Sequence, residues 1–320
     1  MSAHNPFGVL DFLAWDHDWN GHHYPLKDVK RAARLMQEAG VGFVRMDFLW
    51  SDLEPREGQF DFTKYDNLVA ILAEHGLGIL GLLHYNPAWR HGPWNAAPDP
   101  AAYERYAHAV VQHFKGAVAY WEIWNEPDHP TYWQPQDELQ AYCKLLKRIY
   151  PVIKALDSQC QVLMGGLANV QSPNLERLYE LAGGKSFDIV NIHPFVSPLA
   201  DDAIGLLRRM VDDTRATMQR HGDGTKPIWI TEIGCPGSSE NSTWWLGQCP
   251  TETQQAEWTM AVSTEALQWN NVEKIFWAFF RDTRVHFKDA VDYFGLVRHD
   301  FTPKPAYAAY QAAARRYPSR

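Results

Sequence analysis

The chain has 320 residues, of which 46% are hydrophobic and 21% are charged. This composition is typical of a globular protein with a sizeable buried core. The formal net charge of -8 gives no electrostatic support for binding nucleic acid, and no apolar run approaches the roughly 18 residues of a membrane-spanning helix. Residues Met1–Pro6 lack the basic and apolar regions of a signal peptide. A cytoplasmic location and, after removal of a leader, a secreted or periplasmic one both stay open.

Short apolar runs alternate with helical segments along the whole chain. In chain order, the runs that predict β-strands are residues 7–13, 43–48, 78–84, 119–124, 161–166, 188–193, 227–232 and 274–280. The spacing leaves room for one helix between successive strands. This pattern predicts a single α/β domain over residues 1–320, folded as a (β/α)8 TIM barrel. A doubly wound sheet is the alternative, but no glycine-rich phosphate loop follows an early strand.

Two of the helices between the strands are visible from their periodicity. Apolar residues recur at helical spacing from Val29 to Ala39, and Gly40 is the expected C-cap. A second helix is expected over residues 139–149, and Pro151 is expected to interrupt or kink it because proline has no amide hydrogen.

Two glutamates lie where predicted strands end. The stretch Trp121–Asp128 reads as a strand that stops at Asn125-Glu126-Pro127, because Pro127 disfavours a regular continuation. A second apolar run places Glu232 at the end of a later strand. In a barrel the carboxyl ends of all strands meet at one mouth, so the two carboxylates are expected to face each other. Such a pair is what cleavage of a glycosidic bond requires.

Most of the other strand ends are also polar or aromatic. A lone histidine or tryptophan at such a place is more often structural, but convergence of so many on one mouth indicates a binding site. The residues at these ends are Trp15, Asp16, Arg45, Asp47, Trp50, His84, Tyr85, Asn86, Asn125, Asn191, His193, Trp277 and Arg281.

With these residues in place, the chain resembles a retaining β-glycosidase of glycoside hydrolase clan A. The stretch Trp124–Asp128, followed by Tyr132-Trp133, is most similar to family 39, with families 5 and 30 as alternatives. The resemblance implies that Glu126 is the general acid/base and Glu232 the nucleophile. It also implies that Asn125 binds the sugar 2-hydroxyl and that Arg45 keeps Glu232 ionised.

The same resemblance places His84 and His193 around the reacting sugar, with Trp277 as a stacking floor. One position departs from the clan. Many members carry a tyrosine two residues after the histidine of the sixth strand, where it hydrogen-bonds the nucleophile, and this chain has Phe195 there. Either Tyr85 or Tyr293 is expected to supply the hydroxyl, or the site functions without it.

Aromatic residues in the predicted loops favour a carbohydrate substrate, because sugar faces stack on aromatic rings. The expected function is endo-acting hydrolysis of a poly- or oligosaccharide in an open groove. An exo-acting β-xylosidase or other β-glycosidase, and a catalytically silent carbohydrate-binding barrel, are the alternatives. The tryptophans expected to line the groove are Trp15, Trp89, Trp94, Trp133 and Trp245.

No cofactor and no metal are expected. The protein is expected to be a monomer. The segment Asp16–Asp18 with His22 and His23 matches no standard ligand spacing, so a polar loop is favoured over a metal site, although a metal-dependent hydrolase stays a third hypothesis. Glu122 is expected to form a structural ion pair inside the barrel. Cys235 and Cys249 could be bridged or free, and the sequon at Asn241 matters only in a glycosylating host.

Overall fold

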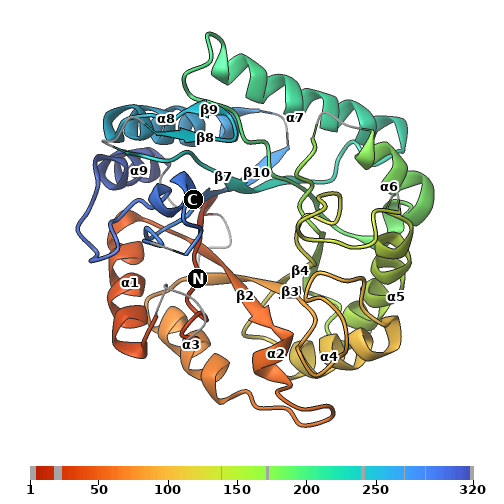
Figure 1. Cartoon of the computed structure of the whole chain (residues 1–320). Helices are drawn as coiled ribbons and strands as arrows, with labels where there is room; N and C mark the ends of the chain where they lie inside the picture. Colours follow the sequence, from red (N-terminus) through yellow and green to blue (C-terminus); the bar gives the residue numbers. More distant parts are fainter. Residues whose placement is uncertain are drawn as a thin grey trace.

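A computed structural model describes residues 5–17, 24–137, 139–170, 173–238, 242–269, 271–284 and 286–317. Eight parallel strands form one barrel, and helices surround it as a ring (Figure 1). The barrel strands are β1 (Phe7–Leu10), β2 (Phe43–Leu49), β3 (Gly78–His84), β4 (Tyr120–Ile123), β5 (Gln161–Met164), β6 (Val190–Ile192), β7 (Ile228–Ile233) and β10 (Val272–Ala278). The prediction of a (β/α)8 barrel is confirmed.

Hydrogen bonds join the strands in the order β5-β4-β3-β2-β1-β10-β7-β6. Isolated parallel bridges from Leu163 to Ile189 and from Leu167 to Ile192 bring the β5 and β6 sides together, so the sheet closes on itself. All eight predicted strands are found. The first is shorter than expected, because the chain leaves the sheet after Leu10.

The helices pack their apolar faces on the outside of the barrel. They are α1 (Leu26–Ala39), α2 (Trp50–Leu53), α3 (Thr63–Glu74), α4 (Pro100–His113), α5 (Gln140–Leu156), α6 (Asn174–Ala182), α7 (Ala203–Arg220), α8 (Glu252–Glu265) and α9 (Pro305–Arg315), with short 3-10 turns η1 (Gly184–Ser186), η2 (Ala266–Gln268) and η3 (Ala290–Tyr293). None of the helices in the described part of the chain is both long and apolar enough to span a bilayer.

Two predictions about helix ends have different outcomes. Gly40 ends α1 in the left-handed conformation, with φ 83°, as expected for a C-cap. Pro151 does not interrupt α5, which continues through it to Leu156. Buried Ile149 and Ile153 flank the proline and hold both halves of the helix against the barrel, so tertiary packing outweighs the one lost backbone bond.

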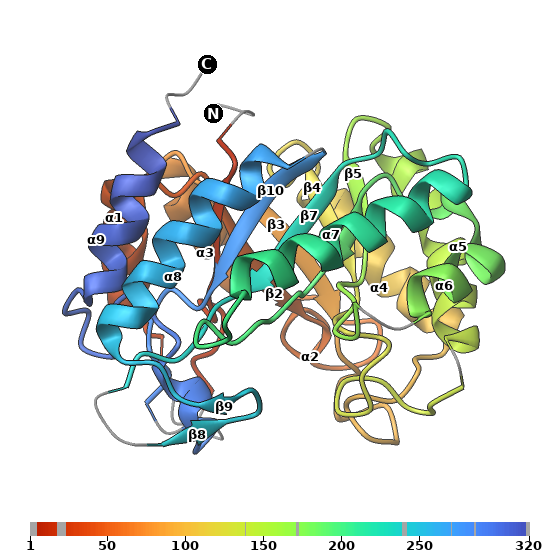
Figure 2. The same ribbon diagram turned by 90° about the horizontal axis from the view of Figure 1, so that it is seen from above.

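The loops after the strands gather at one end of the barrel. They include a small hairpin, β8 (Thr243–Trp244) and β9 (Gly247–Gln248), which follows β7 and projects from the lower edge in Figure 2. Loops at the carboxyl ends of barrel strands form the site in this fold. The candidate residues are therefore expected at this mouth.

Candidate active site

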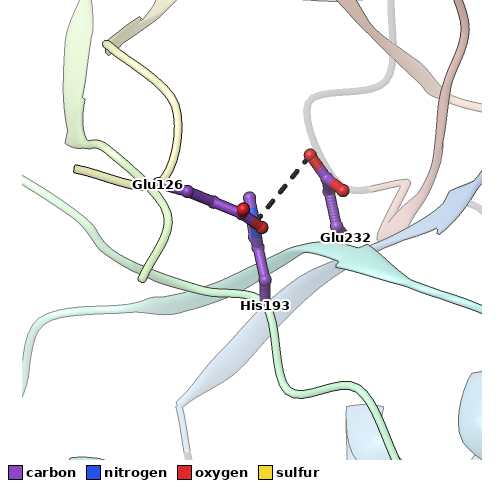
Figure 3. Close-up of side chains that lie close together, drawn as sticks. All are labelled: Glu126, His193 and Glu232. Atoms are coloured by element: carbon purple, nitrogen blue, oxygen red, sulfur yellow. Dashed lines mark hydrogen bonds and ion pairs between the residues drawn. The ribbon is translucent and has the colours of Figure 1, made fainter. Parts of the chain in front are cut away.

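Glu126 and Glu232 meet at the mouth of the barrel, as the sequence predicts. Figure 3 shows the carboxyl group of Glu126 at the ring of His193 and that of Glu232 beside them. One carboxylate oxygen of each glutamate and one ring nitrogen of His193 all lie within 4.8 Å of one another. Residues 67 and 106 positions apart in the chain (193 − 126 and 232 − 126) thus form one compact cluster.

The backbone after β4 turns sharply to present Glu126. Trp124 and Glu126 have positive φ angles of 67° and 42°, which are unfavourable for residues with a side chain. Asp128 holds this turn in place, because its carboxylate accepts hydrogen bonds from the amides of Ala168 (3.0 Å) and Asn169 (2.9 Å). The strained turn explains why the strand stops where the Asn-Glu-Pro triplet begins.

A bulge in β7 turns two consecutive residues into the site. The pairing with β10 shifts between Ile275, opposite Ile230, and Trp277, opposite Ile233, so β7 has one extra residue over this span. Side chains of a regular strand alternate between faces, and a bulge breaks that alternation. Thr231 and Glu232 can therefore both bond to residues of the barrel interior, although they are neighbours in sequence.

Arg45 donates hydrogen bonds to three polar side chains inside the barrel. This buried guanidinium donates to Glu232 Oε1 at 2.6 Å, to Asn125 Oδ1 at 2.8 Å, and to both oxygens of Glu122 at 2.6 and 2.9 Å. Glu122 is fully buried and also accepts from Asn191 Nδ2 and the Gly166 amide. The prediction that Glu122 forms a structural ion pair is thus confirmed, and its partner Arg45 also contacts the expected nucleophile.

His193 connects the two glutamates. Its Nδ1 lies 2.8 Å from Glu126 Oε1 and 3.8 Å from Glu232 Oε1 (Figure 3), and its Nε2 lies 2.9 Å from Thr231 Oγ1. The ring is completely buried. Gly166 makes room for it, because a Cβ at that position would overlap the imidazole.

The electrostatic surroundings of the two glutamates differ. Burial, with a further contribution from the charge of Asp128, raises the pKa of Glu126 to about 8. Burial also raises the pKa of Glu232, but the guanidinium of Arg45 opposes that rise. An ion pair at 2.6 Å stabilises the charged form of Glu232, whereas the described residues around Glu126 provide no ion pair with lysine or arginine. The arrangement favours a protonated Glu126 beside an ionised Glu232.

Three of the expected sugar-binding residues form a connected group on the β1–β3 side. Trp15 donates from Nε1 to Asp47 Oδ2 at 2.6 Å, and His84 Nε2 lies 2.9 Å from the other oxygen of the same carboxylate. Tyr85 packs against His84 with ring centroids 3.8 Å apart and the rings tilted by 32°, and its hydroxyl accepts a long bond, 3.5 Å, from Asn125 Nδ2. Asn125 thus links this group to Arg45.

The structure contradicts two expectations about tryptophans. Trp277 pairs with Val9 and Ile233, which face the helices, so it packs into the outer core with 2% exposure and cannot form a sugar-stacking floor. Trp133 is 1% exposed and packs edge-on against Trp124 and Tyr142 behind the site. The register of β10 and the fold of the loop after β4 decided these orientations, and neither is visible in a strand-end pattern.

Other aromatic rings remain accessible at the rim. Trp94 is 47% exposed in the loop between β3 and α4, and Trp245 is 55% exposed in the β8–β9 hairpin. Trp245 stacks on the buried Phe294 with centroids 5.7 Å apart and meets Phe195 edge-on. Trp89 is half-buried, and its indole nitrogen donates to the carbonyl of Glu54.

Phe195 packs edge-on against Trp245 and Phe294 and has no hydroxyl to offer the nucleophile. Tyr85 reaches Asn125, and Tyr293 lines a separate cavity of about 310 Å³ between the loops after β7 and β10. Tyr132, a residue to which the sequence assigned no role, also lies within the influence of both glutamates. Burial and the charges of Glu126 and Glu232 raise the pKa of its hydroxyl. Its place six residues after Glu126 in an aromatic loop is the signal that could have indicated it.

A metal site was the third hypothesis. Among the described residues, the cluster that could hold an ion is Glu126, His193 and Glu232. The guanidinium of Arg45 already lies 2.6 Å from Glu232, and a second cation there would be repelled. His17 and Asp16 instead bind Asp52 and Lys64 in a polar cluster, whereas Asp18, His22, His23 and Asn241 lie outside the described residues. The expectation of metal-free chemistry stays a prediction.

All four cysteines are buried free thiols, so Cys235 and Cys249 are not bridged in this structure. Burial raises the pKa of Cys235, which keeps this thiol protonated.

Two protein-family models match the chain. The family model described as glycosyl hydrolase catalytic core matches residues 100–310, a span that includes both glutamates, and a β-galactosidase family model matches residues 18–83. A β-galactosidase from an Arthrobacter species is 29% identical over 180 residues, which are 47% of this chain and 26% of that protein. The chain therefore spans about a quarter of the length of that relative.

Solved structures share the fold at low sequence identity. A glycoside hydrolase of family 5 from Streptomyces cattleya, solved with GlcNAc, has a TM-score of 0.78 at 16% identity, covering 99% of this chain and 81% of its own. A family 39 glycoside hydrolase from Bacteroides cellulosilyticus has a TM-score of 0.75 at 20% identity, covering 97% of this chain and 63% of its own. The resemblance to glycoside hydrolases is confirmed, and the chain belongs to the family of the glycosyl hydrolase catalytic core.

Proposed function

We propose that this protein is a retaining β-glycoside hydrolase that uses Glu126 as general acid/base and Glu232 as nucleophile. The observation that carries the proposal is the separation of the two carboxylates, whose facing oxygens lie within 4.8 Å of each other. Retaining enzymes hold their carboxyl groups about 5–5.5 Å apart, whereas inverting enzymes need about 6.5–9.5 Å to admit a water molecule. The short separation supports direct attack by one carboxylate.

In the first step, Glu232 attacks the anomeric carbon while Glu126 gives its proton to the leaving oxygen. Arg45 keeps Glu232 charged in the resting enzyme, and the raised pKa of Glu126, about 8, keeps that group protonated at neutral pH. The bond from the sugar to its leaving oxygen breaks as the ester to Glu232 forms. Asn125, held by Arg45 at 2.8 Å, is placed to bond the sugar 2-hydroxyl as positive charge develops.

In the second step, Glu126 acts as a base. Esterified Glu232 carries no negative charge, and Glu126 has lost its proton to the leaving alcohol. Glu126 then takes a proton from water as that water attacks the anomeric carbon and releases Glu232. Two inversions give net retention, and Glu126 carries out both proton transfers, one to the leaving alcohol and one from water.

The rim supports action on a chain of sugars. In the barrel order β3, β2, β1, β10, β7, the strands that precede the loops of Trp94 and Trp245 are four places apart, so these loops lie on opposite sides of the mouth. Both tryptophans are exposed, and each can stack on a sugar ring. Binding sites on both sides of the glutamates favour an endo-acting enzyme, and a match to an endo-1,4-β-xylanase from Phanerodontia chrysosporium, 31% identical over 83 residues, is consistent with this.

The matches to β-galactosidases favour a second candidate, an exo-acting β-glycosidase that removes single sugars. A catalytically silent barrel is disfavoured, because both glutamates and the arginine that holds the nucleophile are in place. The predicted monomeric state stays a prediction.

The test is hydrolysis of aryl β-glycosides and of β-linked oligosaccharides, with NMR detection of the first anomer formed. We expect the β-anomer first, and from an oligosaccharide we expect internal cleavage products. The α-anomer as first product would refute the retaining mechanism, and release of monosaccharides alone would favour the exo-acting candidate.

A further inference from the structure

A continuous series of hydrogen bonds runs from Arg45 to Glu126 through the inside of the barrel. Arg45 bonds to Glu122, Glu122 to Asn191, Asn191 to Thr231, Thr231 to His193, and His193 to Glu126. We call the residues Glu122, Asn191 and Thr231 the relay. Each member is buried, and its contacts join β4, β6 and β7. The direction of every donor in this series can be assigned from chemistry.

The series begins at a group that can only donate. An arginine guanidinium has no acceptor, and Arg45 donates to both oxygens of Glu122. The Gly166 amide donates to Oε1 of the same carboxylate at 3.1 Å. Glu122 can therefore only accept, and its partner Asn191 must present its NH2 group, at 2.8 Å. This contact fixes which end of the Asn191 amide faces Thr231.

The other end of that amide is the oxygen. Asn191 Oδ1 accepts the hydroxyl proton of Thr231 at 2.6 Å. A hydroxyl has one hydrogen, so Thr231 Oγ1 can only accept from His193 Nε2, which lies 2.9 Å away. His193 must carry its proton on Nε2. A neutral imidazole has one N–H, so Nδ1 then presents a lone pair to Glu126 Oε1, 2.8 Å away.

We propose that the relay fixes His193 as its Nε2–H tautomer, and that the resulting lone pair at Nδ1 holds Glu126 in its protonated, general-acid form. The acid form of Glu126 gains an acceptor on this side, whereas its carboxylate form would face a lone pair without a donor. Thr231, Asn191 and Glu122 are thus positioning residues that act through His193. This inference rests on the proposed function of Glu126 as general acid.

The charged groups around this pair are consistent with a neutral His193. Burial lowers the pKa of His193, and the charge of Arg45 on β2 lowers it further, against Glu232 on β7, Glu122 on β4 and Asp128 in the next loop. Glu126 faces Asp128, His129, Arg45 and Glu122, and its pKa is raised to about 8. A proton shared between these two groups therefore belongs to Glu126 rather than to the imidazole.

The geometry also suits both catalytic steps. When substrate binds, its glycosidic oxygen competes with Nδ1 for the proton of Glu126, and the O–H bond of Glu126 breaks as that of the leaving alcohol forms. In the covalent intermediate the deprotonated Glu126 faces the lone pair again, which makes it a stronger base toward water. The proton returns from water to Glu126, and His193 ends each cycle unchanged.

The first test needs no substrate. In the intact protein labelled with ¹⁵N-histidine, NMR distinguishes the two neutral tautomers by the shifts of the two ring nitrogens, and loss of one signal set in His193→Asn assigns His193. We expect a protonated Nε2 and an unprotonated Nδ1 near neutral pH. A His193 that is protonated at Nδ1 would overturn the proposal.

The second test is Thr231→Val, which keeps the shape of the side chain but removes the hydroxyl, with Thr231→Ser as its matched control. Without an acceptor at Nε2, His193 can move its proton to Nδ1 and donate to the carboxylate of Glu126. The basic limb of the pH profile of kcat/KM should then move to lower pH by about one unit or more. At pH values above the shifted limb, kcat/KM for an unactivated glycoside should fall by about tenfold. A dinitrophenyl glycoside, whose leaving group needs little acid, should change by less than about twofold.

Two variants distinguish a failure of the relay from a failure of the proposed function. Thr231→Ser should restore the tautomer and the pH profile of the wild type. An unchanged tautomer and an unchanged basic limb in Thr231→Val would overturn the relay. If Glu126→Gln retained full activity on unactivated glycosides, the proposed function would fail instead, and the tautomer measured without substrate would still stand or fall by itself.

Discussion

The interior of this barrel has two layers of opposite chemistry. The layer toward the amino ends of the strands is made of apolar side chains, and the ammonium group of buried Lys274 lies over the rings of Phe43 and Trp229. The layer toward the carboxyl ends holds Arg45, Glu122, Asn191, Thr231 and His193, joined by hydrogen bonds. The apolar layer consists of Phe43, Leu80, Leu163, Ile189, Trp229 and Phe276.

The difference between the layers shows how one set of strands serves two purposes. Apolar burial stabilises the barrel without directional demands, at about 25 cal/mol per Å². The polar layer contributes less per group to stability, because burying charges costs almost as much as pairing them returns. It gives defined proton positions instead. We expect substitutions in the two layers to separate stability from activity.

The largest effect on activity is expected from Glu232→Gln in the polar layer. Loss of the nucleophile should lower kcat by roughly 10⁴-fold or more while the fold is retained, because Gln fills the same volume. The measurement is hydrolysis of an aryl β-glycoside beside a circular dichroism melt. Addition of azide to Glu232→Ala should give the α-glycosyl azide, and a β-azide would assign the nucleophile elsewhere.

Glu126→Gln should have the next largest effect, and one that depends on the leaving group. Loss of the general acid should lower kcat/KM by about 10² to 10⁴-fold for unactivated glycosides and much less for dinitrophenyl glycosides. Equal losses with both leaving groups would contradict the acid role.

The wild-type pH profile reports the same group. The acid must be protonated to act and its pKa is raised to about 8, so activity should persist from neutral pH and fall as the pH rises through about 8. An ordinary glutamate would lose its proton near pH 4.5, so a basic limb below pH 6 would refute this assignment.

Glu122→Leu tests whether the base of the polar layer serves both stability and activity. It leaves buried Arg45 with Glu232 and Asn125 but without its main partner, and loss of one member of a buried pair costs about 3–5 kcal/mol. Both the free energy of unfolding, measured with urea, and kcat should fall. A variant that loses stability but keeps full kcat would show that Glu122 serves the fold alone.

Leu163→Ala is the counterpart in the apolar layer. This buried leucine on β5 is the register partner of Glu122, but its side chain belongs to the apolar layer, and its truncation should cost about 2–5 kcal/mol of unfolding free energy. The kcat of the folded protein should stay near that of the wild type. A fall in kcat as large as that of Glu122→Leu would mean that the layers are not separable.

The smallest effects are expected at the rim. Trp245→Ala and Trp94→Ala should each raise KM for an oligosaccharide by about two- to tenfold, the equivalent of one lost ring contact, and leave kcat for a small aryl glycoside almost unchanged. Trp133→Phe, a change in a buried ring, is the matched control and should not alter oligosaccharide KM. An effect of only one rim tryptophan would favour the exo-acting candidate.

Sequence patterns predicted the features that depend on neighbours along the chain. The alternation of apolar runs and helical segments predicted all eight strands, and the Asn-Glu-Pro triplet marked the end of β4 and hence Glu126. The resemblance to a known clan added Arg45 as the partner of Glu232, which the structure places at 2.6 Å. These features follow from local periodicity and turn chemistry, which short stretches of sequence encode.

Tertiary structure decided how the other side chains at the site are oriented. The bulge in β7 turns Glu232 in beside Thr231, and the register of β10 turns Trp277 toward the helices. The bonds that join Arg45 to Glu122, 77 residues apart, and Asn191 to Glu122, 69 residues apart, exist only once the barrel has closed. A one-residue change of register reverses the face of every side chain in a strand, so orientation and pairing depend on the packing of the whole barrel rather than on any local stretch.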